Sequence, residues 1–338
     1  GYDMNKDSRG GVGSNDSEGN AIYVVNAETG QLIWKATGGA GGASSNEFQH
    51  PKFVDSVPST LTTADTDGDG LTDRIYVGDS GGNVWRADLA GSNTGDWKLT
   101  LLASLGRHSA GSFDKSSDRR FFHRPDLVQT KDEFGIFDAV LIGSGDRADP
   151  LDGGGTASNY FYMIKDRNTG VGAGLDTAID DMMLDDVTSN CMQDGSCNLE
   201  MKMGWKLRME SSGEKILATP LTMSGKVFFT SYMPQGGSKA SACSPSEGSG
   251  RLYAVSLQSA ESVINYDTSD DLPTDDDPDG DDPTSKNDRS VELNSAGIPA
   301  EVVTIPPNKI LRPDLQVDTI DVATRWRTYW YVTEDTDL

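Results

Sequence analysis

One unit of short strands recurs along the chain, and this repeat limits the fold more than any other feature of the sequence. Each copy has an apolar strand carrying a proline, a variable loop, a second apolar strand, a Gly-rich turn and a third strand rich in aromatic residues. Three copies run from SVPSTLTTAD to NVWRADLAG, from FFHRPDLVQT to NYFYMIKDRNTG, and from KILATPLTMSG to GRLYAVSLQSA. A fourth starts at GIPAEVVTI, and NAIYVVNAETGQLIW near the start matches the third strand alone. The prolines of the four first strands are Pro58, Pro125, Pro220 and Pro299.

The repeat predicts an all-β fold, a β-propeller. Units that cannot bury both faces alone must stack, and radial stacking around a channel gives a propeller. About four to five blades fit into this chain. We therefore expect residues 1–338 to form part of one propeller domain that begins partway through a repeat, its N-terminal remainder being absent. The acidic insertion 267–290 has no apolar positions, which favours a solvated loop between blades over a weak cation-binding tract.

The charge of the chain excludes two classes of partner. There are 29 Lys and Arg residues against 53 Asp and Glu residues, a net charge of −24. Nucleic acids and anionic membranes would repel such a surface, so neither is expected as a partner. No apolar run reaches the roughly 18 residues that a transmembrane helix needs, so no membrane-spanning segment is expected.

The sequence DTDGDGLTD predicts a calcium site between two strands. Alternating aspartates with glycines between them can wrap a chain around a hard cation, because Ca²⁺ prefers six to eight oxygen ligands. An acidic turn is the alternative, but four like charges in so short a loop would repel one another. Mg²⁺ fits less well because it demands a smaller octahedron. The expected ligands are the side chains of Asp65, Asp67, Asp69 and Asp73 and the backbone carbonyl of Leu71.

Two other motifs suggest enzymes but are better explained by the repeat. GDSGG, residues 78–82, matches the string around the nucleophile of chymotrypsin-like proteases, yet no histidine lies in the motif which that family uses for its base. NAETGQLIW, residues 26–34, resembles the turn motif of quinoprotein dehydrogenase propellers, but the chain has no adjacent cysteine pair. A hairpin turn and blade packing account for both, and we predict that the chain is not an enzyme.

The cysteines indicate an oxidising compartment. Cys191 and Cys197 flank the short polar stretch MQDGS, and a loop of this size closes readily as a disulfide. Free thiols are the alternative. Cys243 would then be an odd thiol or would pair with a segment outside the chain.

Taken together, these stretches resemble the C-terminal domain of the PilY family, which comprises type IV pilus tip-associated biogenesis proteins. The matching pieces include GYDMNKD, DTDGDGLTDRIYVGDSGGNVWRADL, RRFFHRPDLV, LIGSGDRADPLD, GEKILATPLT and the terminal RTYWYV. The resemblance implies a modified seven-bladed β-propeller and a calcium loop at residues 65–73. The long acidic insertion departs from the family pattern, and no Arg-Gly-Asp tripeptide is present, which leaves no basis for an integrin-binding role.

The resemblance also implies a function. It suggests a calcium-dependent pilus biogenesis factor and tip adhesin that supports pilus assembly against retraction, surface attachment and twitching motility. Minor pilins, the assembly machinery, and host-cell or abiotic surfaces would be its partners. Its location would be the cell surface, at the pilus tip or outer membrane, or secreted. The alternatives are a quinoprotein (PQQ) dehydrogenase and a stand-alone adhesive or glycan-binding propeller.

Overall fold

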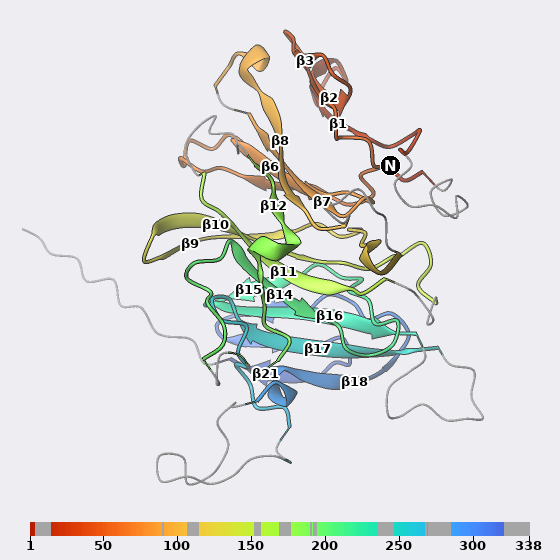
Figure 1. Cartoon of the computed structure of the whole chain (residues 1–338), viewed down its shortest axis with the longest axis vertical. Helices are drawn as coiled ribbons and strands as arrows, with labels where there is room; N and C mark the ends of the chain where they lie inside the picture. The colour runs from red at the N-terminus through yellow and green to blue at the C-terminus, as the bar shows by residue number, and fades with distance from the viewer. Residues whose placement is uncertain are drawn as a thin grey trace, which may run out of the picture.

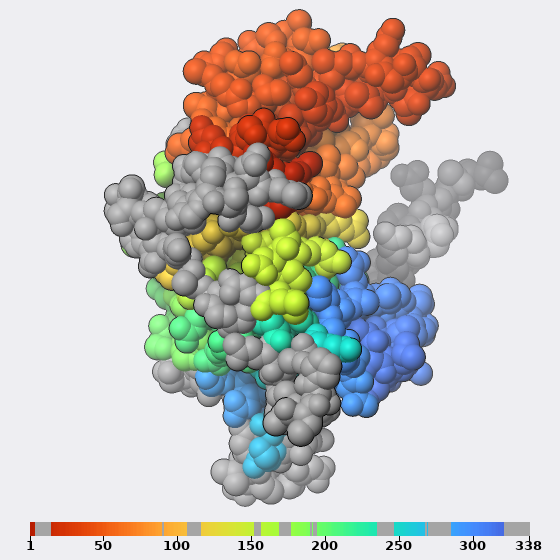
Figure 2. Space-filling view, turned by 90° about the vertical axis from the view of Figure 1, so that its right-hand side faces the viewer, coloured from red at the N-terminus to blue at the C-terminus, as the bar shows by residue number. Residues whose placement is uncertain are grey.

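The computed structural model contains five β-sheets and only short helical turns. It describes residues 1–3, 15–89, 91–106, 115–151, 157–168, 177–189, 191, 195–234, 247–267, 269 and 285–320. Within these ranges there are five sheets, here called A to E; sheets A to D follow one another in chain order along the long axis, and sheet E packs against sheet D (Figure 1). In Figure 2, sheets A and B form the red and orange end, and the blue C-terminal residues lie toward the other end.

The strands and 3₁₀ turns have the following bounds. Sheet A contains β1 (Ala21–Val25), β2 (Leu32–Gly38), β3 (Gly42–Ala43) and β4 (Glu47–His50). Sheet B contains β5 (Thr62–Ala64), β6 (Arg74–Gly78), β7 (Asn83–Asp88), β8 (Lys98–Ser104) and β12 (Ile179–Asp180). Sheet C contains β9 (Asp126–Asp132), β10 (Gly135–Gly143), β11 (Tyr160–Asp166), β13 (Asp185–Asp186) and β14 (Gly204–Arg208). Sheet D contains β15 (Leu221–Met223), β16 (Lys226–Met233), β17 (Ser249–Ser256) and β18 (Ser290–Ala296). Sheet E contains β19 (Val303–Ile305), β20 (Lys309–Leu311) and β21 (Val317–Thr319). The 3₁₀ turns are η1 (Thr94–Asp96), η2 (Lys115–Ser117), η3 (Asp181–Met183) and η4 (Asn287–Arg289).

Four strands of each of the sheets B, C and D share one antiparallel order, and β12 and β13 add a parallel edge strand to sheets B and C. In each, the strands that follow one another along the repeat are hydrogen-bonded neighbours, as in β5, β6, β7 and β8. The first strand of sheet C, β9, contacts the first strands of both neighbouring sheets, β5 and β15. Sheets that meet along their first strands radiate from a common side, which is the arrangement of propeller blades. The predicted all-β propeller fold is therefore confirmed, whereas the seven-blade count stays a prediction.

A separate hydrophobic cluster fills each space between neighbouring sheets. Trp34 of β2 packs with Trp85 of β7 between sheets A and B, as the blade-packing interpretation of its motif predicts. Between sheets C and D, the rings of Phe161 and Phe229 stack with centroids 3.9 Å apart. Similar clusters lie between sheets B and C and between sheets D and E. Because side chains alternate across a strand, each central sheet contributes to the clusters on both of its faces.

The structure corrects two details of the predicted repeat. The four repeat prolines lie before the first strands: Pro125 directly precedes β9, and Pro220 directly precedes β15. Proline has no N–H to donate to a ladder, so the pairing begins after it. The end of the acidic insertion is also folded, because Asp288 and Arg289 are buried in η4 and Ser290 begins β18.

Candidate metal centre

The acidic loop joins β5 to β6 at the edge of sheet B. The backbone N–H of Asp73 donates to the carbonyl oxygen of Ala64 at 2.9 Å, which closes the loop at its base. Gly68 and Gly70 have φ angles of +81° and +87°. These angles lie in the left-handed region, where glycine is unstrained and other residues are disfavoured. The two glycines therefore permit the tight turns of this loop.

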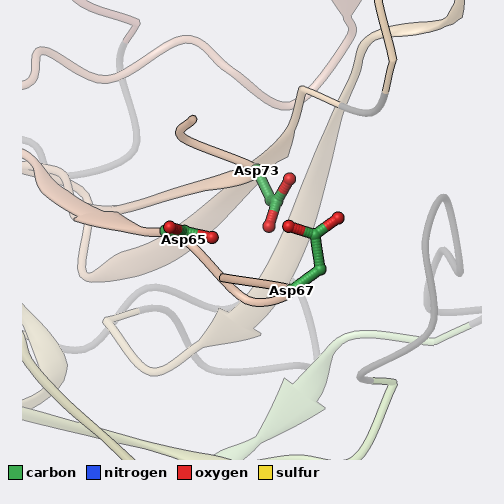
Figure 3. A group of neighbouring side chains, drawn as sticks. All are labelled: Asp65, Asp67 and Asp73. Carbon is green, nitrogen blue, oxygen red and sulfur yellow. The ribbon is translucent and has the colours of Figure 1, made fainter. Parts of the chain in front are cut away.

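Three aspartates of the loop converge. Asp65, Asp67 and Asp73 each place one carboxylate oxygen within 4.8 Å of the others. Figure 3 shows the carboxylates of Asp67 and Asp73 facing each other, with Asp65 across the loop. Oxygen ligands of Ca²⁺ lie at roughly 2.3–2.6 Å from the ion, so two ligands of one ion are at most about 5 Å apart. The spacing and the hard oxygen donors of these three residues therefore fit a calcium ion.

Asp69 and Leu71 lie outside this group of carboxylates. The sequence predicts a fourth carboxylate ligand at Asp69, which is not among the three convergent carboxylates; its Oδ1 accepts the backbone N–H of Leu71 at 2.8 Å. Short side chains such as aspartate readily accept the N–H two residues on, and ligation by Asp69 stays a prediction. The side chain of Leu71 is exposed, and ligation by its carbonyl oxygen stays a prediction.

Backbone N–H groups hold the loop in shape. The two oxygens of Asp65 accept the N–H groups of Gly68 and Gly70, at 2.7 and 2.9 Å. Asp67 Oδ1 accepts the N–H of Asp69 at 3.1 Å. Each carboxylate oxygen has two lone pairs, so one such bond leaves it able to bind a cation as well. The loop therefore presents its carboxylates from a backbone that its own hydrogen bonds fix.

Thr66 positions Asp73, a role that the sequence analysis missed. Its hydroxyl and its backbone N–H both donate to Asp73 Oδ2, at 2.7 and 2.6 Å. Both bonds lower the pKa of the Asp73 carboxyl because they stabilise its ionised form, and the bond from the hydroxyl has the larger effect. A hydroxyl residue directly after the first aspartate is the signal that could have revealed this contact.

A buried charge cluster begins at the residue after the loop. We use this name for Arg74, Tyr76, Arg86, Asp88, Asp138 and Asp166, which are all buried where sheets B and C meet. Arg74 pairs with Asp138 at 2.7 Å, and Arg86 pairs with Asp166 at the same distance. The Tyr76 hydroxyl lies 3.1 and 3.0 Å from these two carboxylates, and its one proton can be donated to either of them. The strand that leaves the acidic loop is thus bound to the next sheet.

The remaining predicted motifs have structural roles. Ser80 of the GDSGG string is fully buried, and its hydroxyl donates to Asp16 Oδ2 at 2.9 Å. Asp79 accepts the N–H groups of Gly81 and Asn83, as expected for a tight turn between β6 and β7. Burial raises the pKa of Asp79 to about 6. A serine buried in a turn is not presented to a substrate, so this motif belongs to the repeat.

The cysteines are placed as follows. Cys191 and Cys197 are joined in a disulfide, with Cα atoms 5.1 Å apart. Cys243 lies outside the described residues, as do most of the acidic insertion and the terminal RTYWYV segment.

Comparison with known proteins finds relatives of the chain. No family model matches it. It is 27% identical over 268 residues to the type IV pilus biogenesis factor PilY1 homolog of Xylella fastidiosa, covering 75% of this chain and 18% of that protein. It is 31% identical over 121 residues to the type IV pilus biogenesis factor PilY1 of Pseudomonas aeruginosa, covering 36% of this chain and 9% of that protein. These similarities support a relationship of the chain to the PilY family.

The fold comparison agrees with this relationship. The crystal structure of the Pseudomonas aeruginosa PilY1 C-terminal domain superposes with a TM-score of 0.59 at 17% sequence identity. The match covers 89% of this chain and 66% of that one. At this identity the match shows that the two chains share a fold. Within the described residues, no helix has the length and apolar character needed to cross a membrane.

Proposed function

We propose that this chain is the calcium-binding C-terminal domain of a type IV pilus biogenesis factor. The observation that carries the proposal is the convergence of Asp65, Asp67 and Asp73 in a chain whose curated relatives are PilY1 proteins. Bound Ca²⁺ would offset the repulsion between these exposed carboxylates. The group has only oxygen donors, which suits Ca²⁺ better than a transition metal.

The contact between the loop and the buried charge cluster offers a route from the ion to the rest of the fold. Ca²⁺ at Asp73 would hold the start of β6, and the next residue, Arg74, pairs with Asp138 of sheet C. Binding would therefore stabilise the junction of two blades and the surface that they present. On this proposal, the calcium-bound form engages minor pilins or the assembly machinery, supports the pilus against retraction, and promotes surface attachment and twitching. The chain acts at the cell surface or pilus tip.

Calorimetry tests the calcium part of the proposal. We expect Ca²⁺ to bind the purified chain at one site and to raise its Tm, and we expect Asp73→Ala to abolish both effects. Glu133→Ala is the matched control, because it removes an exposed carboxylate outside the loop. If the wild-type chain binds no Ca²⁺ at millimolar concentrations, the loop is an acidic turn and the calcium proposal is wrong.

Piliation tests the functional part separately. A deletion strain complemented with the Asp73→Ala gene should have fewer surface pili and reduced twitching in calcium-containing medium. Normal pili in a variant that has lost calcium binding would refute the regulatory role and leave the metal site intact. Normal pili in the deletion strain would favour a stand-alone adhesive propeller.

A further inference from the structure

A polar cavity lies between sheets C and D, and it has no residue in common with the acidic loop. Its volume is about 540 Å³, within the range typical of small-molecule sites. Residues from β14, β17, η4 and the start of β18 line it. Three arginines are among them: Arg208, Arg251 and Arg289.

Within the described part of the chain, Arg289 is buried without an ion pair. It is 2% exposed, and its guanidinium donates to three backbone carbonyls: Nη1 to Val187 at 2.7 Å and Thr188 at 3.4 Å, and Nη2 to Ser189 at 3.3 Å. Its Nε is buried and has no hydrogen-bond partner among these residues. Among the described residues, no carboxylate lies within 4.0 Å of this side chain. Burial accordingly lowers the pKa of Arg289.

Arg289 differs in this respect from the other deeply buried arginines. Arg74 and Arg86 each pair with two carboxylates of the buried charge cluster. Isolating a charge from water is costly unless it is paired, and this chain has 53 acidic residues from which a partner might come. Among the residues that the structure describes, no carboxylate supplies this charge, so Arg289 is suited to an anionic ligand.

Arg251 adds a second guanidinium to the same cavity. Its side chain is hydrogen-bonded to Tyr253, and Glu214 and Glu292 act on it only at longer range. Of the carboxylates that line the cavity, Glu210 pairs with Lys286 at 3.1 Å and not with either arginine. Asp267 and Glu292 also line the cavity and would favour a small anion over a highly charged one.

We propose that the cavity between sheets C and D binds an oxyanion, a carboxylate or phosphate group of a small ligand, through Arg251 and Arg289. The planar guanidinium donates two parallel hydrogen bonds to such groups and keeps its charge at all physiological pH values. The site is independent of the calcium loop and goes beyond the proposed pilus function.

Thermal unfolding in sodium phosphate, sodium acetate and sodium chloride at equal ionic strength tests this site. Calcium is left out, since it precipitates with phosphate. We expect the Tm to rise with phosphate or acetate concentration and to saturate, because a ligand that binds only the folded state stabilises it. A response to phosphate alone assigns a phosphoryl group, and a response to acetate alone assigns a carboxylate.

Two variants decide whether the arginines are responsible. Arg251→Gln and Arg289→Gln should each weaken the apparent affinity about tenfold or more, as expected for losing a charge-assisted hydrogen bond. Arg124→Gln removes an exposed arginine outside the cavity and should leave the response unchanged. If Arg289→Gln does not fold, Arg251→Gln carries the test. Equal Tm values in the three salts, or a full response in the variants, would overturn the proposal.

Discussion

The acidic loop and the buried charge cluster are joined at Asp73 and Arg74, yet they handle carboxylate charge in opposite ways. In the loop, Asp65, Asp67 and Asp73 face one another near solvent, and backbone N–H groups are the donors to Asp65. In the cluster, Asp138 and Asp166 are buried and bound by arginines at 2.7 Å. Water and a cation can offset repulsion at the surface, whereas a buried carboxylate needs a partner from the chain itself. The loop is therefore suited to a ligand, and the cluster to holding two blades together.

The largest expected effect comes from breaking the cluster. Asp166→Ala would leave Arg86 buried without its 2.7 Å partner and remove an acceptor of the Tyr76 hydroxyl. We expect a loss of about 3–5 kcal/mol in the free energy of unfolding, measured by urea denaturation. Asp67→Ala in the loop should change stability without calcium by about 0.5 kcal/mol or less. Equal losses in the two variants would show that the loop and the cluster do not differ as described.

A smaller effect is expected from straining the loop backbone. Gly70→Ala places a side chain at a φ of +87°, although nothing lies within 4 Å of the new Cβ. The strain should lower both stability and calcium binding by about 1–2 kcal/mol. Gly95→Ala, at an angle outside the left-handed region, is the control and should be neutral. Calorimetry that finds unchanged calcium affinity in Gly70→Ala would contradict the role of this turn.

The smallest effect should come from replacing Thr66, which positions Asp73. Thr66→Val removes the hydroxyl that donates to Asp73 Oδ2 at 2.7 Å and leaves the backbone N–H bond in place. We expect calcium affinity to fall by about 0.5–1.5 kcal/mol, with little change in the unfolding of the calcium-free chain. Thr63→Val, at an exposed position of β5, serves as the matched control. The same affinity in both variants would mean that Thr66 does not orient Asp73.

The sequence located the central strands of each blade better than the outer ones. β6 and β7, or β16 and β17, are dense in β-branched and aromatic residues and lie on either side of a recurring turn or loop, so the repeat predicts them. The outer strands follow loops of varied length: β11 ends at Asp166, and β14 begins only at Gly204. Because their spacing differs between copies, the repeat gave no register for these strands.

The sequence alone determined the acidic loop, because its aspartates are neighbours in the chain and alternate at a spacing that local backbone geometry turns toward one point. It did not reveal that Asp69 lies outside the group of three carboxylates, or that Thr66 holds Asp73 through a hydrogen bond of its hydroxyl. Tertiary structure decided the buried charge cluster and the burial of Arg289. The members of the cluster are distant in sequence, such as Tyr76 and Asp166, which are separated by 90 positions. Charged residues within apolar strands indicate that partners exist, but only the packing of one sheet on the next determines which partners they are.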